Sequence, residues 1–169
     1  DGDAAADLFD ATQAITRAAG LPRYEVSNHA RRGEESRHNL TYWRYGDYAG
    51  IGPGAHGRRL AQATERHKKP ENFTAAVERN GHGLKRETDL PSHERATEAM
   101  LMGLRLTEGV DLVRVEARSG LPRDAFIDAT AVTRLAAQGL VGEKGDKLMV
   151  TDDGILLLDS ILSEVVKTH

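Results

Sequence analysis

YEVSNHARRGEESRHNLTYWRYGDYAGIGPGAHG, residues 24–57, is the stretch around which the rest of this chain is arranged. It contains the only Trp, all four Tyr and three of the seven His, and it ends in a glycine-rich turn. Polar groups beside aromatic rings must find partners or stay hydrated, and each glycine brings backbone entropy that folding removes. So costly a composition over so short a span favours a ligand-binding site.

The overall composition indicates a globular protein with one ordinary domain or two small ones. The chain has 169 residues, of which 39% are apolar and 29% are charged. No apolar run approaches the roughly 20 residues that cross a bilayer, and the acidic N-terminus lacks a secretion signal. We therefore expect a soluble, cytoplasmic protein without stable membrane insertion. The absence of Cys excludes disulfides, thiolate nucleophiles and cysteine-ligated metal centres within these residues.

Charge is distributed unevenly along the chain. Residues 23–69 carry ten Lys and Arg against five Asp and Glu, whereas residues 92–169 carry nine against thirteen. A basic, aromatic-rich region suits an anionic or carboxylate-bearing ligand. The acidic C-terminal part does not suit the phosphate backbone of a nucleic acid.

The N-terminal half predicts few regular elements. Apolar residues at helical spacing, among them Leu8 and Ile15, predict a helix over 3–19. A short strand follows at 23–27 and a charged loop at 28–35. Residues 38–48 are interpreted as an irregular segment that enters a strand near 48–51, and the glycine-rich turn comes next. Residues 58–89 are a polar excursion that holds one short helix, at about 71–80.

The C-terminal part predicts a winged-helix-like module. Helices are expected at 92–106, with Ser92 as N-cap, and at 112–118 and 123–138. A hairpin follows at 140–150 and a last helix after Thr151, which we expect to cap it. The third helix offers only Arg123 and Arg134 to a nucleic acid, so a structural role for this module is favoured.

HNLTYW, residues 38–43, has the chemistry to hold a planar metallated ring. The imidazole of His38 can ligate iron or donate to a carboxylate, and Tyr42 and Trp43 offer flat faces. The alternative is structural: the two rings would seal the end of a sheet while His38 and Asn39 form hydrogen bonds in a loop.

GIGPGAHG, residues 50–57, resembles a phosphate-cradling loop but lacks the Lys-Ser/Thr pair of a P-loop. Its glycines allow bare backbone to approach a ligand closely. A plain glycine-rich turn beside a buried neighbour is at least as good an interpretation. His56 is interpreted as a hydrogen-bonding loop residue rather than as a general base.

Taken together, these stretches resemble the C-terminal half of the oxygen-independent coproporphyrinogen III oxidase family of radical-SAM proteins. The match is best to its HemW-like haem-chaperone branch, whose HNxxYW is present as His38-Asn39-Leu40-Thr41-Tyr42-Trp43. EAMLMGLRLTEGVDL (98–112) and LMVTDDGILLLDSILSEVV (148–166) are similar to the C-terminal domain of that family. The resemblance covers essentially the whole chain.

The resemblance implies an α/β fold, namely the end of a partial (β/α)6 barrel followed by a mostly helical, winged-helix-like domain. It places the barrel portion at 1–60, a polar linker at 61–91 and the helical domain at 92–169. It also implies S-adenosylmethionine and a [4Fe–4S] cluster on a CxxxCxxC loop in the full-length parent. Because this chain has no Cys, we expect a fragment that is inactive alone. His29 stands where Phe is usual in the family, and Ser36 stands where Cys is frequent.

By the same resemblance the cofactor-binding residues are His38, Asn39, Tyr42 and Trp43 for haem, and Gly52, Gly54, Ala55 and His56 for S-adenosylmethionine. No catalytic residue and no resident metal ligand is assigned. The function implied is haem binding and delivery to an unknown acceptor protein. Oxidative decarboxylation of coproporphyrinogen III propionates is the alternative enzyme function, and a winged-helix nucleic-acid module is the remaining one.

Overall fold

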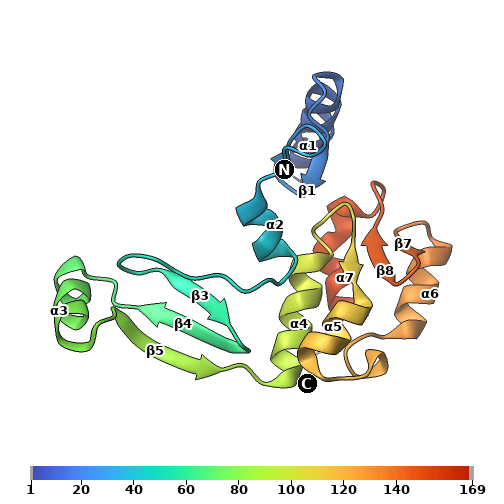
Figure 1. The fold of residues 1–169 in the computed structure, drawn as a ribbon. Coiled ribbons are helices and arrows are strands. Elements are labelled where there is room, and N and C mark those ends of the chain that lie inside the picture. The colour runs from blue at the N-terminus through green and yellow to red at the C-terminus, as the bar shows by residue number, and fades with distance from the viewer. Residues whose placement is uncertain (1, 168–169) are drawn as a thin grey trace.

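The computed structural model describes residues 2–167 and has a mixed α/β fold, as the sequence predicts (Figure 1). The N-terminal region contains α1 (Gly2–Ala18), β1 (Arg23–Glu25), β2 (Asn28–His29) and α2 (Arg37–Trp43). A middle region follows with β3 (His56–Arg59), β4 (Gln62–Arg66), α3 (Pro70–Asn80) and β5 (Leu84–Asp89). None of the described helices is long and apolar enough to cross a membrane.

The C-terminal region is richest in helices. It contains α4 (Ser92–Gly103), β6 (Val110–Asp111), α5 (Leu112–Ser119), η1 (Arg123–Ala125), α6 (Ala129–Ala137), β7 (Val141–Lys144), β8 (Lys147–Val150), η2 (Ile155–Leu157) and α7 (Leu158–Val165). Strands β6, β8 and β7 form an antiparallel sheet in that order. Helices, a hairpin and a last helix give the winged-helix-like arrangement that the sequence predicts.

Helix α1 forms where it is predicted, but the apolar residues whose spacing indicates it are exposed. Leu8 and Ile15 are each 70% exposed, whereas Phe9 packs against the core and Gln13 bonds to His29 at 3.2 Å. Figure 1 shows α1 projecting from the rest of the molecule. Helical periodicity identifies α1, but which face of α1 packs against the protein depends on the elements beside it. No described element covers the side that bears Ile15.

The segment at 38–48 is more regular than predicted, because α2 occupies its first part. Ser36 is the N-cap, accepting a hydrogen bond from the Asn39 backbone N–H at 3.3 Å. The strand expected near 48–51 does not form. Tyr48 instead makes an isolated antiparallel bridge to Arg58, and Gly52-Pro53 prevents the ladder from extending in this direction.

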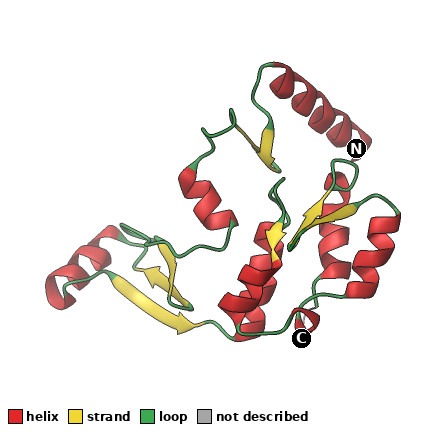
Figure 2. Ribbon diagram, turned by 45° about the vertical axis from the view of Figure 1, so that its right-hand side comes forward, coloured by secondary structure: helices red, strands yellow, loops and turns green. Residues whose placement is uncertain are grey.

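Residues 61–91 contain the predicted short helix as α3, but they are not otherwise irregular. Strands β3, β4 and β5 form an antiparallel sheet, with α3 connecting the last two. Figure 2 shows this sheet extending to one side of the C-terminal region, with α3 at its far end. Alternation is hard to recognise in β5, LKRETD, because nearly all of it is exposed and polar.

The main core lies in the C-terminal region and includes Met100 and Phe126, both fully buried.

The third helix starts later than predicted, at Ala129, because Asp128 is its N-cap and accepts hydrogen bonds from the backbone N–H groups of Thr130 and Ala131. Ser92 is not the N-cap of α4; Pro91 takes that position, and Ser92 Oγ accepts from Arg95 at 3.1 Å. Thr151 does not cap the last helix as predicted: Leu157 is the N-cap of α7, and Thr151 Oγ1 accepts from the Gly154 N–H at 3.1 Å in the turn before η2.

Candidate functional site

Helix α2 divides the HNxxYW residues into two adjacent faces. Residues four apart in a helix lie on the same face, so His38 shares one face with Tyr42 and Asn39 shares the next with Trp43. No residue of α2 is fully buried. The helix is therefore held by specific contacts rather than by a core, and the two faces have different partners.

The face that bears Asn39 is tied to the β1–β2 hairpin. Asn39 Nδ2 donates to the Tyr24 hydroxyl and to Asn28 Oδ1, both at 3.2 Å. Asn28 Nδ2 in turn donates to Glu25 Oε2 at 2.6 Å. The side-chain amides of Asn39 and Asn28 thus connect the start of α2 to a carboxylate in the neighbouring strand.

Glu25 is the anchor of this network and is completely buried. Its carboxylate also accepts from the Ser27 backbone N–H at 3.1 Å and from Arg105 Nε at 2.7 Å. Burial alone would raise the pKa of Glu25, but the hydrogen bonds from Asn28, Ser27 and Arg105 outweigh it and lower the pKa below its usual value. Glu25 therefore stays ionised and compensates the Arg105 charge.

Arg105 connects this buried ion pair to the second end of the motif. Its guanidinium carbon lies 4.7 Å from the centroid of the Trp43 ring. Asn39 and Trp43 are thereby fixed by one continuous set of contacts that runs from β1 to Arg105, two residues after α4. In that role both residues shape the site rather than reach outward from it.

His38 has the opposite character. It is exposed at the start of α2, and its imidazole has no hydrogen bond or ion pair within residues 2–167. Tyr42, on the same face, stacks edge-on against Trp43 and Tyr48, with ring centroids 5.1 Å and 5.7 Å apart. An available imidazole beside a fixed aromatic cluster is suited to a flat ligand that needs a nitrogen donor.

The glycine-rich turn is built mainly for its own geometry. Gly52 and Gly54 have positive φ angles of 92° and 73°, which glycine adopts without strain. The Gly54 N–H donates to the His67 carbonyl at 2.8 Å, and the Ala55 N–H donates to Gly52 at 3.3 Å. These two N–H groups are therefore already used, while the backbone around Gly52 is open and His56 is exposed.

The structure does not bring the two groups of predicted site residues together. Figure 1 shows the loop after α2 running along the sheet toward α3, so that the turn lies well away from α2. Among the described residues no hydrogen bond, ion pair or ring contact joins Gly52, Gly54, Ala55 or His56 to α2. The connection is indirect and passes through Tyr48, which stacks on Tyr42 and pairs with Arg58.

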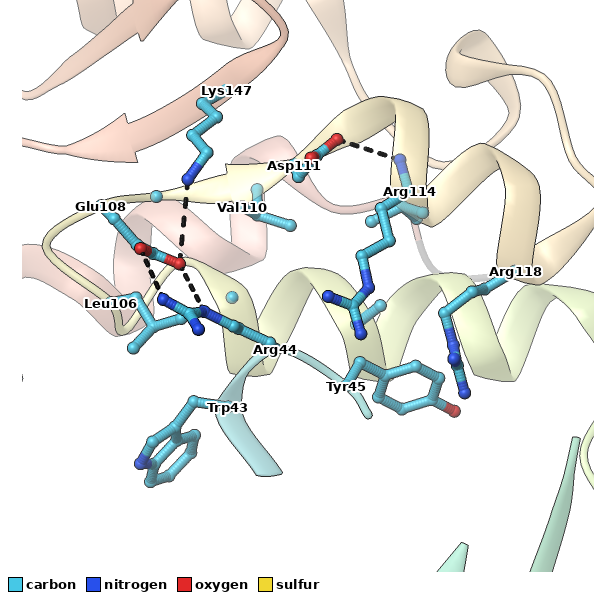
Figure 3. Close-up of a pocket in the computed structure, with 14 residues that line it drawn as sticks. Trp43, Arg44, Tyr45, Leu106, Glu108, Val110, Asp111, Arg114, Arg118 and Lys147 are labelled. Carbon is cyan, nitrogen blue, oxygen red and sulfur yellow. Dashed lines mark hydrogen bonds and ion pairs between the residues drawn. The ribbon is translucent and has the colours of Figure 1, made fainter. Parts of the chain in front are cut away.

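A cavity of about 220 Å³ opens on the other side of Trp43 (Figure 3). It lies between the end of α2, helix α4 and the β6–α5 corner. Sequence reasoning did not single out its charged residues, nor Glu25 and Arg105. The partners Glu25 and Arg105 are 80 positions apart, so local patterns do not reveal them. The four-residue spacing inside HNLTYW and the preceding Ser36, however, are signals from which α2 could have been found.

The residues present do not fit an iron–sulfur cluster, since the chain has no Cys. The described residues also contain no group of three or more His, Cys, Asp or Glu that could hold a metal ion. What α2 can provide is a single imidazole, aromatic faces and nearby cationic groups. Such a set suits a ligand that brings its own metal.

Comparison with known proteins shows which family this chain resembles. Residues 90–157 match the family model of the HemN C-terminal domain. Radical S-adenosyl methionine domain-containing protein 1, mitochondrial, of Mus musculus is 38% identical over 173 residues, covering 96% of this chain and 39% of that protein. Heme chaperone HemW of Escherichia coli (strain K12) is 34% identical over 168 residues, covering 96% of this chain and 42% of that protein. The chain thus spans about two fifths of the length of these relatives.

The fold is also similar to a solved structure, coproporphyrinogen III oxidase (HemN) from Escherichia coli, a radical-SAM enzyme. The TM-score is 0.66 at 21% identity, over 93% of this chain and 39% of that one. Fold and sequence together define a C-terminal region of a radical-SAM protein of the HemW and HemN family. Within that family the chain is HemW-like.

Proposed function

We propose that this chain is the haem-binding C-terminal part of a haem chaperone, in which His38 offers its imidazole to the haem iron. The observation that carries the proposal is the division of α2 into two faces. Asn39 and Trp43 are held by Glu25 and Arg105, whereas His38 remains exposed without a partner among the described residues. A site made to bind a ligand keeps its donor group free and fixes the residues around it.

The aromatic cluster supports the same proposal. Tyr42 lies on the face of His38 and is braced by Trp43 and Tyr48, which limits how its ring can move. A porphyrin presents a large apolar face that such rings can cover. Haem is here the cargo rather than a resident group, and the acceptor protein that would receive it is not identified by any residue of this chain.

Two further parts of the proposal concern the full-length parent. Residues 1–60 would complete a barrel that carries the cluster, 61–91 would connect the parts, and 92–169 would form the helical domain. Gly52, Gly54, Ala55 and His56 would face S-adenosylmethionine there, which the open backbone at Gly52 supports. A cytoplasmic location is part of the same proposal.

The enzyme alternative has less support. The likeness to coproporphyrinogen III oxidase is at 21% identity and concerns the fold alone. The relatives at 30–34% identity include several that are named heme chaperones. A nucleic-acid role for the winged-helix-like region is disfavoured, because Arg134 on α6 is already paired with Glu164.

A haem titration followed by Soret absorbance tests the proposal. His38→Ala should weaken haem binding by roughly ten-fold or more, a loss comparable to that from substitutions around metal sites. His82→Ala is the matched control, because His82 is also exposed but lies between α3 and β5, away from α2. Equal losses from the two substitutions would rule out His38 as the haem-binding residue.

A further inference from the structure

The cavity beside Trp43 has an apolar floor and a charged rim (Figure 3). The floor consists of small or aliphatic residues on α4, the α4–β6 loop, β6 and α5: Ala99, Gly103, Leu106, Val110 and Val115. At about 220 Å³ the space is several times that of a water molecule and can take a short side chain of a ligand. Because Trp43 lies at its edge, the cavity adjoins the haem site proposed above.

The rim has an excess of positive charge. Four cations line the cavity, Arg44, Arg114, Arg118 and Lys147, against the two carboxylates of Glu108 and Asp111. Arg44 donates to Glu108 in a bidentate manner, at 2.7 Å and 2.9 Å, and Lys147 lies 3.8 Å from the same carboxylate. Glu108 is thus already occupied by two cations and does not compensate the charge on the α5 side.

Arg114 is the cation left without a partner. Its guanidinium has no hydrogen bond or ion pair in the described part of the chain, and only its backbone N–H is used, in capping by Asp111 at 3.0 Å. Figure 3 shows the Arg114 side chain reaching from α5 toward Tyr45, with Arg118 beside it. Arg118 pairs with Asp47 but keeps 30% of its side chain exposed, so it can share a second anion.

We propose that this cavity binds a carboxylate of the tetrapyrrole, with Arg114 as the principal partner and Arg118 as the second. This inference rests on the proposed function, because it assigns a propionate group of the haem to a cavity next to the HNxxYW helix. A planar guanidinium matches a carboxylate with two parallel N–H···O bonds. The aliphatic arm of the propionate would lie on the apolar floor, and the edge of the ring against Trp43.

The test compares three probes on the wild-type chain and on two variants. The probes are haem, haem dimethyl ester, whose propionates are blocked, and metal-free protoporphyrin IX, which keeps the propionates but has no iron. Arg114→Gln removes the proposed partner, and Arg134→Gln removes an arginine from α6, outside the cavity. Soret absorbance gives the affinity, and circular dichroism verifies that each variant folds.

Arg114→Gln should weaken the binding of haem and of protoporphyrin IX by about ten-fold each, because one charge-assisted pair of hydrogen bonds is lost. The ester should bind wild type and Arg114→Gln with equal affinity. Arg134→Gln should leave the affinity for all three probes unchanged. If haem binds Arg114→Gln as tightly as wild type, the cavity assignment is wrong while the haem-binding proposal stands. If none of the three probes binds the wild-type chain, both proposals fail for this chain.

Discussion

The C-terminal region and the region around α2 keep their shapes by different means. Every residue of the main buried cluster except Tyr45 lies at position 96 or later. Helix α2, by contrast, has no buried residue, and the sheet β3–β5 leaves Leu60 84% exposed. The first region is stabilised by apolar burial, and the second by hydrogen bonds, ion pairs and stacked rings.

This difference has a consequence for the candidate site. Contacts such as Glu25–Arg105 and Arg105–Trp43 fix positions without surrounding them by a core. The residues of α2 can therefore lose their arrangement while the C-terminal region stays folded. Stability and ligand binding should respond separately to substitutions in the two regions, and the predictions below use that separation.

The largest effect is expected from Phe126→Ala, in the C-terminal core. Phe126 is fully buried, so removing its ring should lower the free energy of unfolding by about 3–5 kcal/mol. Urea denaturation followed by circular dichroism measures the change. Phe9→Ala serves as control, because Phe9 packs against the same cluster but is only partly buried. An equal loss for the two variants would contradict the assignment of Phe126 to the centre of the core and of Phe9 to its edge.

Glu25→Gln should have the next largest effect, about 2 kcal/mol, because it leaves Arg105 without its ionic partner. The pKa of Glu25 is lowered on folding, so its contribution is complete above the usual value of 4.5 and is lost as the pH falls through the folded-state pKa. The difference in the free energy of unfolding between wild type and Glu25→Gln should therefore be constant from neutral pH down to about 4.5 and become smaller below it.

Unfolding measured at several pH values, with Glu34→Gln alongside, tests this expectation. Glu34 is exposed and makes only a 3.8 Å ion pair with Arg31. Glu25→Gln should also reduce haem affinity, since Asn28 and Asn39 depend on the same carboxylate for their positions. If the difference in the free energy of unfolding between wild type and Glu25→Gln grew as the pH was lowered, the Glu25 carboxyl would be protonated in the native protein.

Most of the C-terminal region could be predicted from the sequence, because its elements are specified by local patterns. Apolar residues at helical spacing identify α4 and α5, and the turn at Gly145 with its flanking strands identifies the β7–β8 hairpin. The errors there are at element ends, such as Ser92 and the late start of α6, where capping geometry decides.

The sheet β3–β5 and the docking face of α1 could not be predicted in the same way. Strand β5 is almost wholly exposed, so it lacks the alternation that burial imposes. The HNxxYW residues could be singled out as a candidate site, but the division of α2 into a fixed face and an available face depends on Glu25 and Arg105, which are far apart in sequence. Long-range polar partners leave no local periodicity.

Ser36→Ala should have a smaller effect, about 1 kcal/mol on α2, because it removes the N-cap of that helix. The loss should appear as weaker haem binding with little change in the unfolding of the C-terminal region. Ser92→Ala is the informative control: Ser92 begins α4 without capping it, so its removal should cost less. Haem titration and urea denaturation on both variants give the two values, and a larger stability loss from Ser92→Ala would contradict the assignment of caps.

The smallest effect is expected from Ile15→Ser on α1, within about 0.5 kcal/mol of wild type, because the side chain is 70% exposed and Ile and Ser have similar helix propensities. Phe9→Ser, on the face that packs against the core, should cost distinctly more. Urea denaturation of the two variants tests which face of α1 docks. A greater loss from Ile15→Ser would mean that α1 turns the face that bears Ile15 inward in solution.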